Sequence, residues 1–217
     1  MEKEVRKLTP QEQKRKKKFD EVCENLAKEG YVKTDLTVSI LAANLFAILV
    51  MAPFMLLALG VFYLLVPSYD VTFTAWHGVF MFAVAIVLIV LHELIHGLTW
   101  GYFAKKHFRS IDFGVIWSMV TPYCTCEEPL KRWQYILGAM MPTLVIGVGL
   151  TGYACISHSI FWLCLAELML LSGGGDFLII YKILLHKSRG KQAYYYDHPY
   201  ECGLVVFEKT DAPVFSK

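Results

Sequence analysis

Two long stretches of the chain contain no charged residue, and they constrain its fold more than any other feature. No Asp, Glu, Lys or Arg occurs between Asp35 and Asp70, and none occurs between Arg132 and Glu167. Each stretch exceeds the ~20 apolar residues that a helix needs to cross the hydrocarbon layer of a bilayer. Charged residues make up 18% of the 217 residues, whereas soluble proteins contain about 25%. We therefore expect an integral membrane protein.

The hydrophobic segments predict an all-α, polytopic core over residues 36–190, with four transmembrane helices at about 37–66, 76–104, 133–156 and 160–186. Lys and Arg concentrate on the cytoplasmic side of membrane helices. All 21 of them lie before the first predicted helix, in the loop 105–132, or from Lys182 onward. We therefore expect a multi-pass protein of the bacterial cell membrane with both termini and this loop in the cytoplasm. Because these charges are the ones that the positive-inside rule requires, the lipid bilayer is an expected partner and no nucleic acid partner is expected.

The polar segments predict a small amount of structure outside the membrane. Residues 1–35 are expected to form a cytoplasmic helix and a short extended piece, and Thr9-Pro10-Gln11-Glu12 is typical of the capping box that starts such a helix. Loop 105–132 carries β-branched and aromatic residues between turn formers, which favours a β-hairpin. Residues 191–217 are expected to form a cytoplasmic tail that contains a strand near residues 203–207.

One motif, His92-Glu93-Leu94-Ile95-His96, carries chemistry. Positions i and i+4 of a helix lie on one face, so both imidazoles can bind one Zn²⁺ while the Glu deprotonates a water. The motif lies inside the second predicted span, where ionisable groups are costly and indicate a function. The alternative is a pair of histidines that hydrogen-bond between helices. We expect His92 and His96 to be zinc ligands and Glu93 to be the general base.

Zinc needs a third protein ligand, and depth in the membrane favours Asp176 over Glu167. A helix rises ~1.5 Å per residue, which places His96 ~13 Å inside the cytoplasmic end of its span at Lys105. On the same scale Asp176 lies ~16 Å from Lys187, and Glu167 lies ~30 Å from it. Asp176 is therefore the expected third ligand, and the fourth position stays open for water.

Other residues at this depth are candidates for secondary roles. The glycines of residues 172–175 would loosen the helix beside a cavity, or allow close helix packing. Asn44 and Thr143 could hydrogen-bond a developing oxyanion or orient a ligand His, and interhelical packing is the alternative for both. Cys124 and Cys126 form a weak metal signature, because two thiolates lack a second pair.

Several motifs together resemble the putative zincin peptidase family, and the resemblance covers most of residues 30–208. This family is similar to site-2-type intramembrane metalloproteases, which cut membrane-embedded substrates using H-E-x-x-H on one helix and an Asp on a later helix. The motifs that carry the resemblance are His92-Glu93-x-x-His96, the segment from Thr121-Pro122-Tyr123 to Glu128-Pro129-Leu130, Gly174-Gly175-Asp176, Asp197-His198-Pro199 and Gly203-Leu204.

Carried over to this chain, the resemblance implies the same roles for the H-E-x-x-H residues and for Asp176. It also implies that the hairpin after the motif helix presents substrate as an added strand. The chain departs from the site-2 pattern at two points: Gly138 and Pro142 are not adjacent, and no Asn-Pro precedes the Asp. Cleavage within the membrane and cleavage beside it are therefore both open.

We expect a zinc metalloprotease that hydrolyses peptide bonds of membrane or membrane-proximal proteins. The alternative is a non-catalytic zinc-binding membrane protein, either a transporter or a scaffold. A transporter usually shows paired repeats or ligands along a route through the membrane, whereas the polar groups here cluster at one depth. A pure binding site also has no need of Glu93 between its two His ligands.

Overall fold

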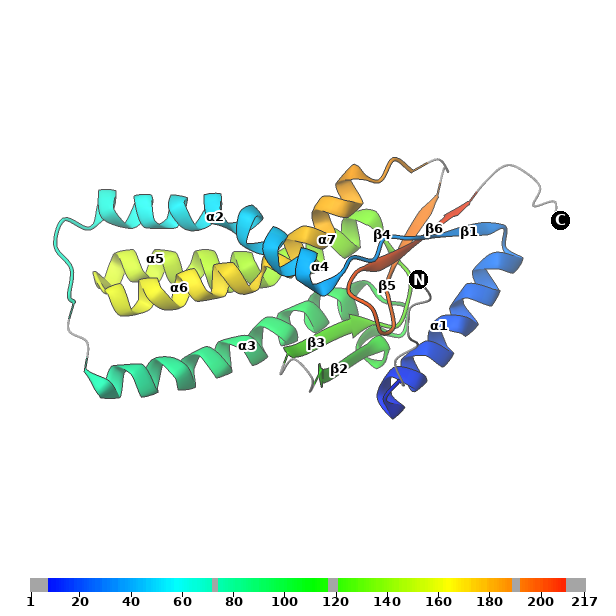
Figure 1. Cartoon of the computed structure of the whole chain (residues 1–217), viewed down its shortest axis with the longest axis horizontal. Coiled ribbons are helices and arrows are strands. Elements are labelled where there is room, and N and C mark those ends of the chain that lie inside the picture. Colours follow the sequence, from blue (N-terminus) through cyan, green and yellow to red (C-terminus); the bar gives the residue numbers. More distant parts are fainter. Residues whose placement is uncertain (1–7, 72–73, 117–120, 189–191, 210–217) are drawn as a thin grey trace.

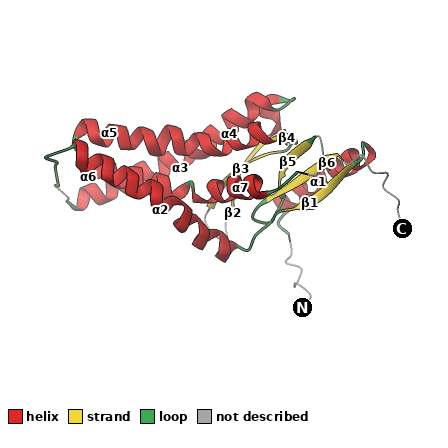
Figure 2. Cartoon of the chain, turned by 90° about the horizontal axis from the view of Figure 1, so that it is seen from above, coloured by secondary structure: helices red, strands yellow, loops and turns green. Residues whose placement is uncertain are grey.

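The computed structural model describes residues 8–71, 74–116, 121–188 and 192–209. A bundle of long helices forms one end of the molecule, and a small sheet with one further helix forms the other (Figures 1 and 2). The loops that join α2 to α3 and α5 to α6 lie at the end away from the sheet. The expected segments 1–35, 105–132 and 191–217 each extend partly outside the described residues.

The four predicted spans are confirmed as helices that are long and apolar enough to cross a membrane. Their ends lie within three residues of the predicted positions. Large apolar side chains such as Leu64 and Trp76 point outward and are 86% and 80% exposed, which suits contact with lipid. The elements that form the spans are α2 (Ile40–Leu65), α3 (Ala75–Phe103), α4 (Arg132–Pro142), α5 (Gly149–Ser157), α6 (Ile160–Ser172) and α7 (Gly174–Leu185).

The third and fourth spans are both interrupted. In the third span a π-helical segment, η2 (Thr143–Val148), separates α4 from α5. Pro142 explains this widening, because proline has no N–H and its ring displaces the carbonyl four residues earlier. In the fourth span the helix breaks at Gly173, between α6 and α7. The glycines thus interrupt the helix, as the sequence predicted.

A four-stranded antiparallel sheet of order β1-β6-β5-β4 stands at the end of the bundle. Strand β1 precedes the first span and β6 follows the last, and they pair from Tyr31 with Lys209 to Asp35 with Val205. Both strands therefore lie on the same side of the helices. The strands are β1 (Tyr31–Asp35), β4 (Leu130–Lys131), β5 (Ala193–Asp197) and β6 (Leu204–Lys209).

Strand β6 is buried on both faces, because helices cover the sheet from two sides. Leu204 and Val206 belong to the cluster that joins the sheet to α3, α4 and α7. Val205 and Phe207 belong to a second cluster, which packs against α1 (Pro10–Lys28). The sheet thus ties the first and last segments of the described chain to the sheet-side ends of the spans.

Helix α1 begins at the predicted capping box. The Glu12 N–H donates to the Thr9 hydroxyl over 3.3 Å, and the Thr9 N–H donates to the Glu12 carboxylate over 2.8 Å. Further along the helix, the Arg15 guanidinium lies 4.2 Å from the centre of the Tyr123 ring. Helix α1 therefore contacts the segment that follows α3 as well as the sheet.

That segment forms the predicted hairpin, in which β2 (Ile111–Ile116) pairs antiparallel with β3 (Thr121–Cys126). The turn between the two strands lies outside the described residues. A short 3₁₀ helix, η1 (His107–Ser110), connects the hairpin to α3. The hairpin packs closely on α3, because a Cβ at Gly97 would come within 2.4 Å of the Phe113 ring.

Candidate metal centre

His92, His96 and Asp176 converge between α3 and α7. The two His side chains lie one turn apart on α3 and are 6% and 3% exposed. The His92 Nε2 atom is 3.2 Å from one carboxylate oxygen of Asp176, and the His96 Nε2 atom is 3.4 Å from the other. The potential ligand atoms of all three residues lie within 4.8 Å of one another. The structure thus brings together the three residues that the sequence indicated as ligands.

This donor set fits a zinc ion. Zinc bonds of ~2.0–2.2 Å would place neighbouring ligand atoms of a tetrahedral site about 3.3 Å apart, which is close to the two imidazole–carboxylate distances. Two His and one carboxylate also leave a fourth position for water or substrate, as catalytic zinc sites require. Within the described ranges, no second group of three His, Cys, Asp or Glu side chains is close enough together to hold a metal.

The backbone of α4 orients the His96 ring. The His96 Nδ1 atom lies 2.9 Å from the carbonyl oxygen of Gly138. A carbonyl can only accept, so Nδ1 carries the hydrogen and Nε2 of the neutral ring offers its lone pair to a metal. The Gly138 carbonyl is free for this bond because its usual helical donor would be the N–H of residue 142, and that residue is Pro142.

Trp100 holds the His96 ring from the other direction. The two rings are stacked, with centroids 4.9 Å apart and planes at 14°. The Trp100 Nε1–H donates to the backbone carbonyl of Tyr135 over 3.2 Å. Gly138 makes room for this indole, since a Cβ there would lie 2.0 Å from Nε1. His96 is therefore fixed both by a hydrogen bond and by packing.

Glu93 lies beside the three candidate ligands, as a general base would have to. Its half-buried carboxylate interacts electrostatically with His92, His96 and Asp176. It also accepts a hydrogen bond from the backbone N–H of Cys124 in β3. The carboxylate thus faces both the metal-binding residues and the hairpin.

Close helix packing at two glycines places Asp176. A Cβ at Gly173 would lie 2.1 Å from the Thr143 hydroxyl, and a Cβ at Gly174 would lie 2.5 Å from Ala47. Larger residues would push α7 away from the third span at one point and from the first span at the other. The packing alternative for these glycines is thus supported, together with the helix break that they allow.

The other polar residues considered as candidates either lie apart from the three candidate ligands or make no hydrogen bond to a described residue. Thr143 is 4% exposed, and among the described residues its buried hydroxyl has no hydrogen-bonding partner. Asn44 is exposed on α2. Glu167, which depth in the membrane disfavoured, has two buried carboxylate oxygens with no partner among the described residues, and it is not part of the metal-binding group.

Cys124 and Cys126 lie buried in β3 as thiols. Burial raises the pKa of both side chains, that of Cys126 to about 12. Since the thiolate is the form that binds metal, these cysteines are poorly suited to it at neutral pH.

Sequence reasoning missed the residues that surround His96. Trp100 follows His96 at i+4 on the same helix face, a spacing that could have indicated contact with the ring. The second missed residue, Tyr135, gave no comparable signal, because its contact depends on how α4 lies against α3. The third is Asp197, which the sequence indicates only as part of a family motif. Its carboxylate accepts a hydrogen bond from the Tyr135 hydroxyl.

Comparison with known proteins supports a peptidase family. A family model described as "Putative zincin peptidase" matches residues 85–191, which confirms the resemblance drawn from the motifs. The matched segment contains the H-E-x-x-H motif, the hairpin and Asp176. No curated protein and no solved structure matches the chain significantly.

Proposed function

We propose, from the place of residues 85–191 in the zincin peptidase family, that the protein is a membrane-embedded zinc metalloprotease. Its substrates would be membrane or membrane-proximal proteins. The observation that carries the proposal is the convergence of His92, His96 and Asp176 with Glu93 at their side. A general base next to two His ligands and one carboxylate ligand is the arrangement that metal-assisted peptide hydrolysis needs.

The roles of the residues follow from their positions. A zinc ion in this site would act as a Lewis acid for the scissile carbonyl and would make a water more acidic. Glu93 is placed to accept the proton of that water and to return it to the leaving amine. The backbone N–H of Cys124 in β3 lies beside the Glu93 carboxylate, so the hairpin borders the proposed base.

The hairpin supports a protein substrate. Strand β3 lies against α3, and its Cys124 backbone is the point at which it meets Glu93. An extended peptide can add to the edge of a strand through main-chain hydrogen bonds. Such a peptide beside the hairpin would bring its carbonyl groups close to the ligand residues.

The proposed orientation places the sheet and both termini in the cytoplasm. Pairing of β1 with β6 puts the two ends of the membrane core on one side, and the Lys and Arg residues gather on that side. His96 lies seven residues before the end of α3 at Phe103, about 10 Å along the helix. Water would therefore reach the site from the cytoplasm.

Zinc content and peptidase activity of the detergent-purified protein test the proposal. We expect wild type and Glu93→Gln to bind stoichiometric zinc, and Asp176→Ala to lose most of it. Cleavage of membrane-anchored peptides, followed by mass spectrometry, should occur with wild type and stop with Glu93→Gln. Glu167→Gln is the matched control, because this carboxyl lies in the bundle outside the metal-binding group.

Two outcomes would contradict the proposal. If wild type binds no zinc, or if Asp176→Ala binds it as tightly as wild type, the assigned ligands are wrong. If wild type binds zinc but cleaves no peptide, the result favours a non-catalytic zinc protein, either a scaffold or a transporter.

A further inference from the structure

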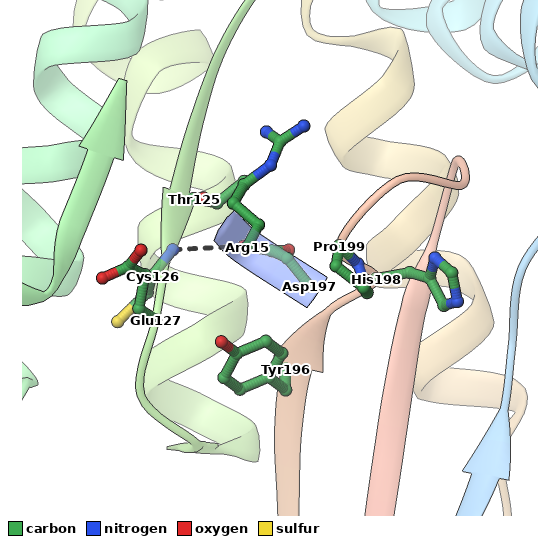
Figure 3. A pocket seen from close by; sticks show the side chains of 8 residues that line it. All are labelled: Arg15, Thr125, Cys126, Glu127, Tyr196, Asp197, His198 and Pro199. Atoms are coloured by element: carbon green, nitrogen blue, oxygen red, sulfur yellow. Dashed lines mark hydrogen bonds between the residues drawn. The ribbon is translucent and has the colours of Figure 1, made fainter. Parts of the chain in front are cut away.

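Asp197, at the end of β5, is a carboxylate that links the sheet to the membrane helices. One carboxylate oxygen accepts a hydrogen bond from the Tyr135 hydroxyl on α4. The other accepts from the Cys126 N–H on β3 over 3.3 Å, the bond drawn as a dashed line in Figure 3. The cavity beside it has a volume of about 10 Å³, room for at most one water. Asp197 is partly buried and makes both of these hydrogen bonds to protein groups.

Tyr135 connects Asp197 to the proposed metal centre. Its side chain is 1% exposed, so α4 cannot shift without moving the hydroxyl away from Asp197. Its backbone carbonyl accepts the hydrogen bond from Trp100, and the Trp100 indole stacks on His96. Three contacts therefore connect Asp197 to a proposed zinc ligand.

A second contact depends on the same helix. Gly138 lies one turn after Tyr135 on α4, and its carbonyl accepts the hydrogen bond from His96. A displacement of α4 along or about its axis would move both carbonyls together. The position of α4 thus controls the hydrogen bond to His96 as well as the packing of its ring.

We propose that Asp197 is a positioning residue for the metal centre, which acts through Tyr135 to hold the backbone of α4 in register with His96. The inference rests on the proposed zinc site. It gives the sheet, which contributes none of the proposed ligands, a role in metal binding. Residues that orient a metal-ligating His typically change metal affinity by about 10–100-fold when they are altered. Because Asp197 acts on His96 only through other residues, we expect a change in zinc affinity near the lower end of this range.

Zinc affinity of the detergent-purified, full-length protein, measured by competition with a chromophoric chelator, tests the inference. Asp197→Ala and Tyr135→Phe should each weaken zinc binding about tenfold. The double variant should also be weakened about tenfold, not a hundredfold, because both changes remove the same contact. Asp197→Asn should bind within about threefold of wild type, since its amide oxygen can still accept from Tyr135 and only the longer bond from the Cys126 N–H is lost.

A matched control separates positioning from general stability. Tyr31, on the edge strand β1, donates a comparable hydrogen bond to Gln192 over 2.9 Å. Tyr31→Phe should leave zinc affinity unchanged. The visible absorption of Co²⁺-loaded protein gives a second readout, and we expect its band pattern to change in Tyr135→Phe and to stay unchanged in Tyr31→Phe.

The outcomes distinguish this inference from the proposed function. Suppose that wild type binds zinc and that Tyr135→Phe has the same zinc affinity and the same Co²⁺ spectrum as wild type. This result would overturn the inference but not the proposed function. Additive losses in the double variant would equally show that Asp197 does not act through Tyr135. A wild-type protein without zinc would overturn the proposed function, and the inference with it.

Discussion

The Nδ1 atom of His96 lies 2.9 Å from the carbonyl oxygen of Gly138. This carbonyl would accept a helical hydrogen bond in an unbroken helix, but Pro142 stands at the donor position and has no N–H to give. A proline on one membrane helix thus makes an acceptor available to a histidine on another. The proposed metal centre therefore depends on residues that do not touch the candidate ligand atoms.

Gly138→Ala should weaken zinc binding about 10–100-fold. The added Cβ would lie 2.0 Å from the Trp100 indole nitrogen, and the ring that stacks on His96 would have to move. Chelator competition measures the loss. Gly149→Ala, in the same span but with no atom within 4 Å of the new Cβ, is the control. Equal affinities in the two variants would refute the role of Gly138.

Pro142→Ala should stabilise the helix and yet weaken zinc binding. The new N–H can donate to the Gly138 carbonyl and so compete with His96 for the same acceptor. Proline inside a helix costs ~3 kcal/mol, and part of this should return as a higher melting temperature. Opposite changes in melting temperature and zinc affinity are expected. Parallel changes in both quantities would show that the competition does not occur.

Gly97→Ala should slow peptide cleavage while zinc stays bound. A Cβ at this position would come within 2.4 Å of the Phe113 ring, which pushes the hairpin away from α3. The comparison is with Gly78→Ala, a change in the same helix where the Cβ meets no atom within 4 Å. Zinc content and cleavage rate should be measured on the same preparations, and loss of zinc from Gly97→Ala would argue against a separate role for the hairpin.

Thr143→Val should leave zinc binding intact and raise thermal stability. The Thr143 hydroxyl is buried, and no described residue hydrogen-bonds to it, which costs ~1–3 kcal/mol that valine avoids at nearly the same shape. Thermal melting in detergent measures the gain. A fall in kcat of about 100-fold with normal zinc content would instead assign the hydroxyl to oxyanion stabilisation.

The stability that Asp197 contributes should fall as pH rises from about 4 to about 6. Burial raises the pKa of this carboxyl from 3.8 to about 6, against the opposing hydrogen bonds from Tyr135 and Cys126. The folded protein therefore binds the proton more tightly than the unfolded chain in this range. The free energy of unfolding contributed by Asp197 decreases as the pH rises and the proton dissociates. Asp197→Asn should flatten this part of the pH profile of the melting temperature. An unchanged slope would contradict the raised pKa.

Much of the membrane core could be predicted from the sequence, because its determinants are local. Runs of uncharged residues define spans, and the capping box at Thr9 defines a helix start. Depth along a helix follows from residue counting, which favoured Asp176 over Glu167 before any contact was known. These predictions need only the rise of a helix, the cost of a charge in lipid or a local capping pattern.

The sequence predicts a strand near residues 203–207, where β6 lies, but the pairing of the sheet and the surroundings of His96 could not be predicted in the same way. Strand β5 is a run of tyrosines in a polar tail, and it becomes a strand because β4 and β6 provide partners on both sides. The acceptor at Gly138 depends on where α4 lies against α3. Asp197 finds Tyr135 across the boundary between sheet and bundle. All three depend on contacts between segments far apart in the chain.

The strand order has a consequence for biosynthesis. Strand β1 leaves the ribosome before the four described spans, and its partner β6 is the last described element to be made. Strand β1 therefore has no β6 to pair with while the four helices are inserted. A nascent chain that stops before Leu204 would already carry every proposed ligand, but it would lack the strand that closes the sheet around β5. The sheet beside the proposed metal centre would thus be completed only after all four described spans have been made.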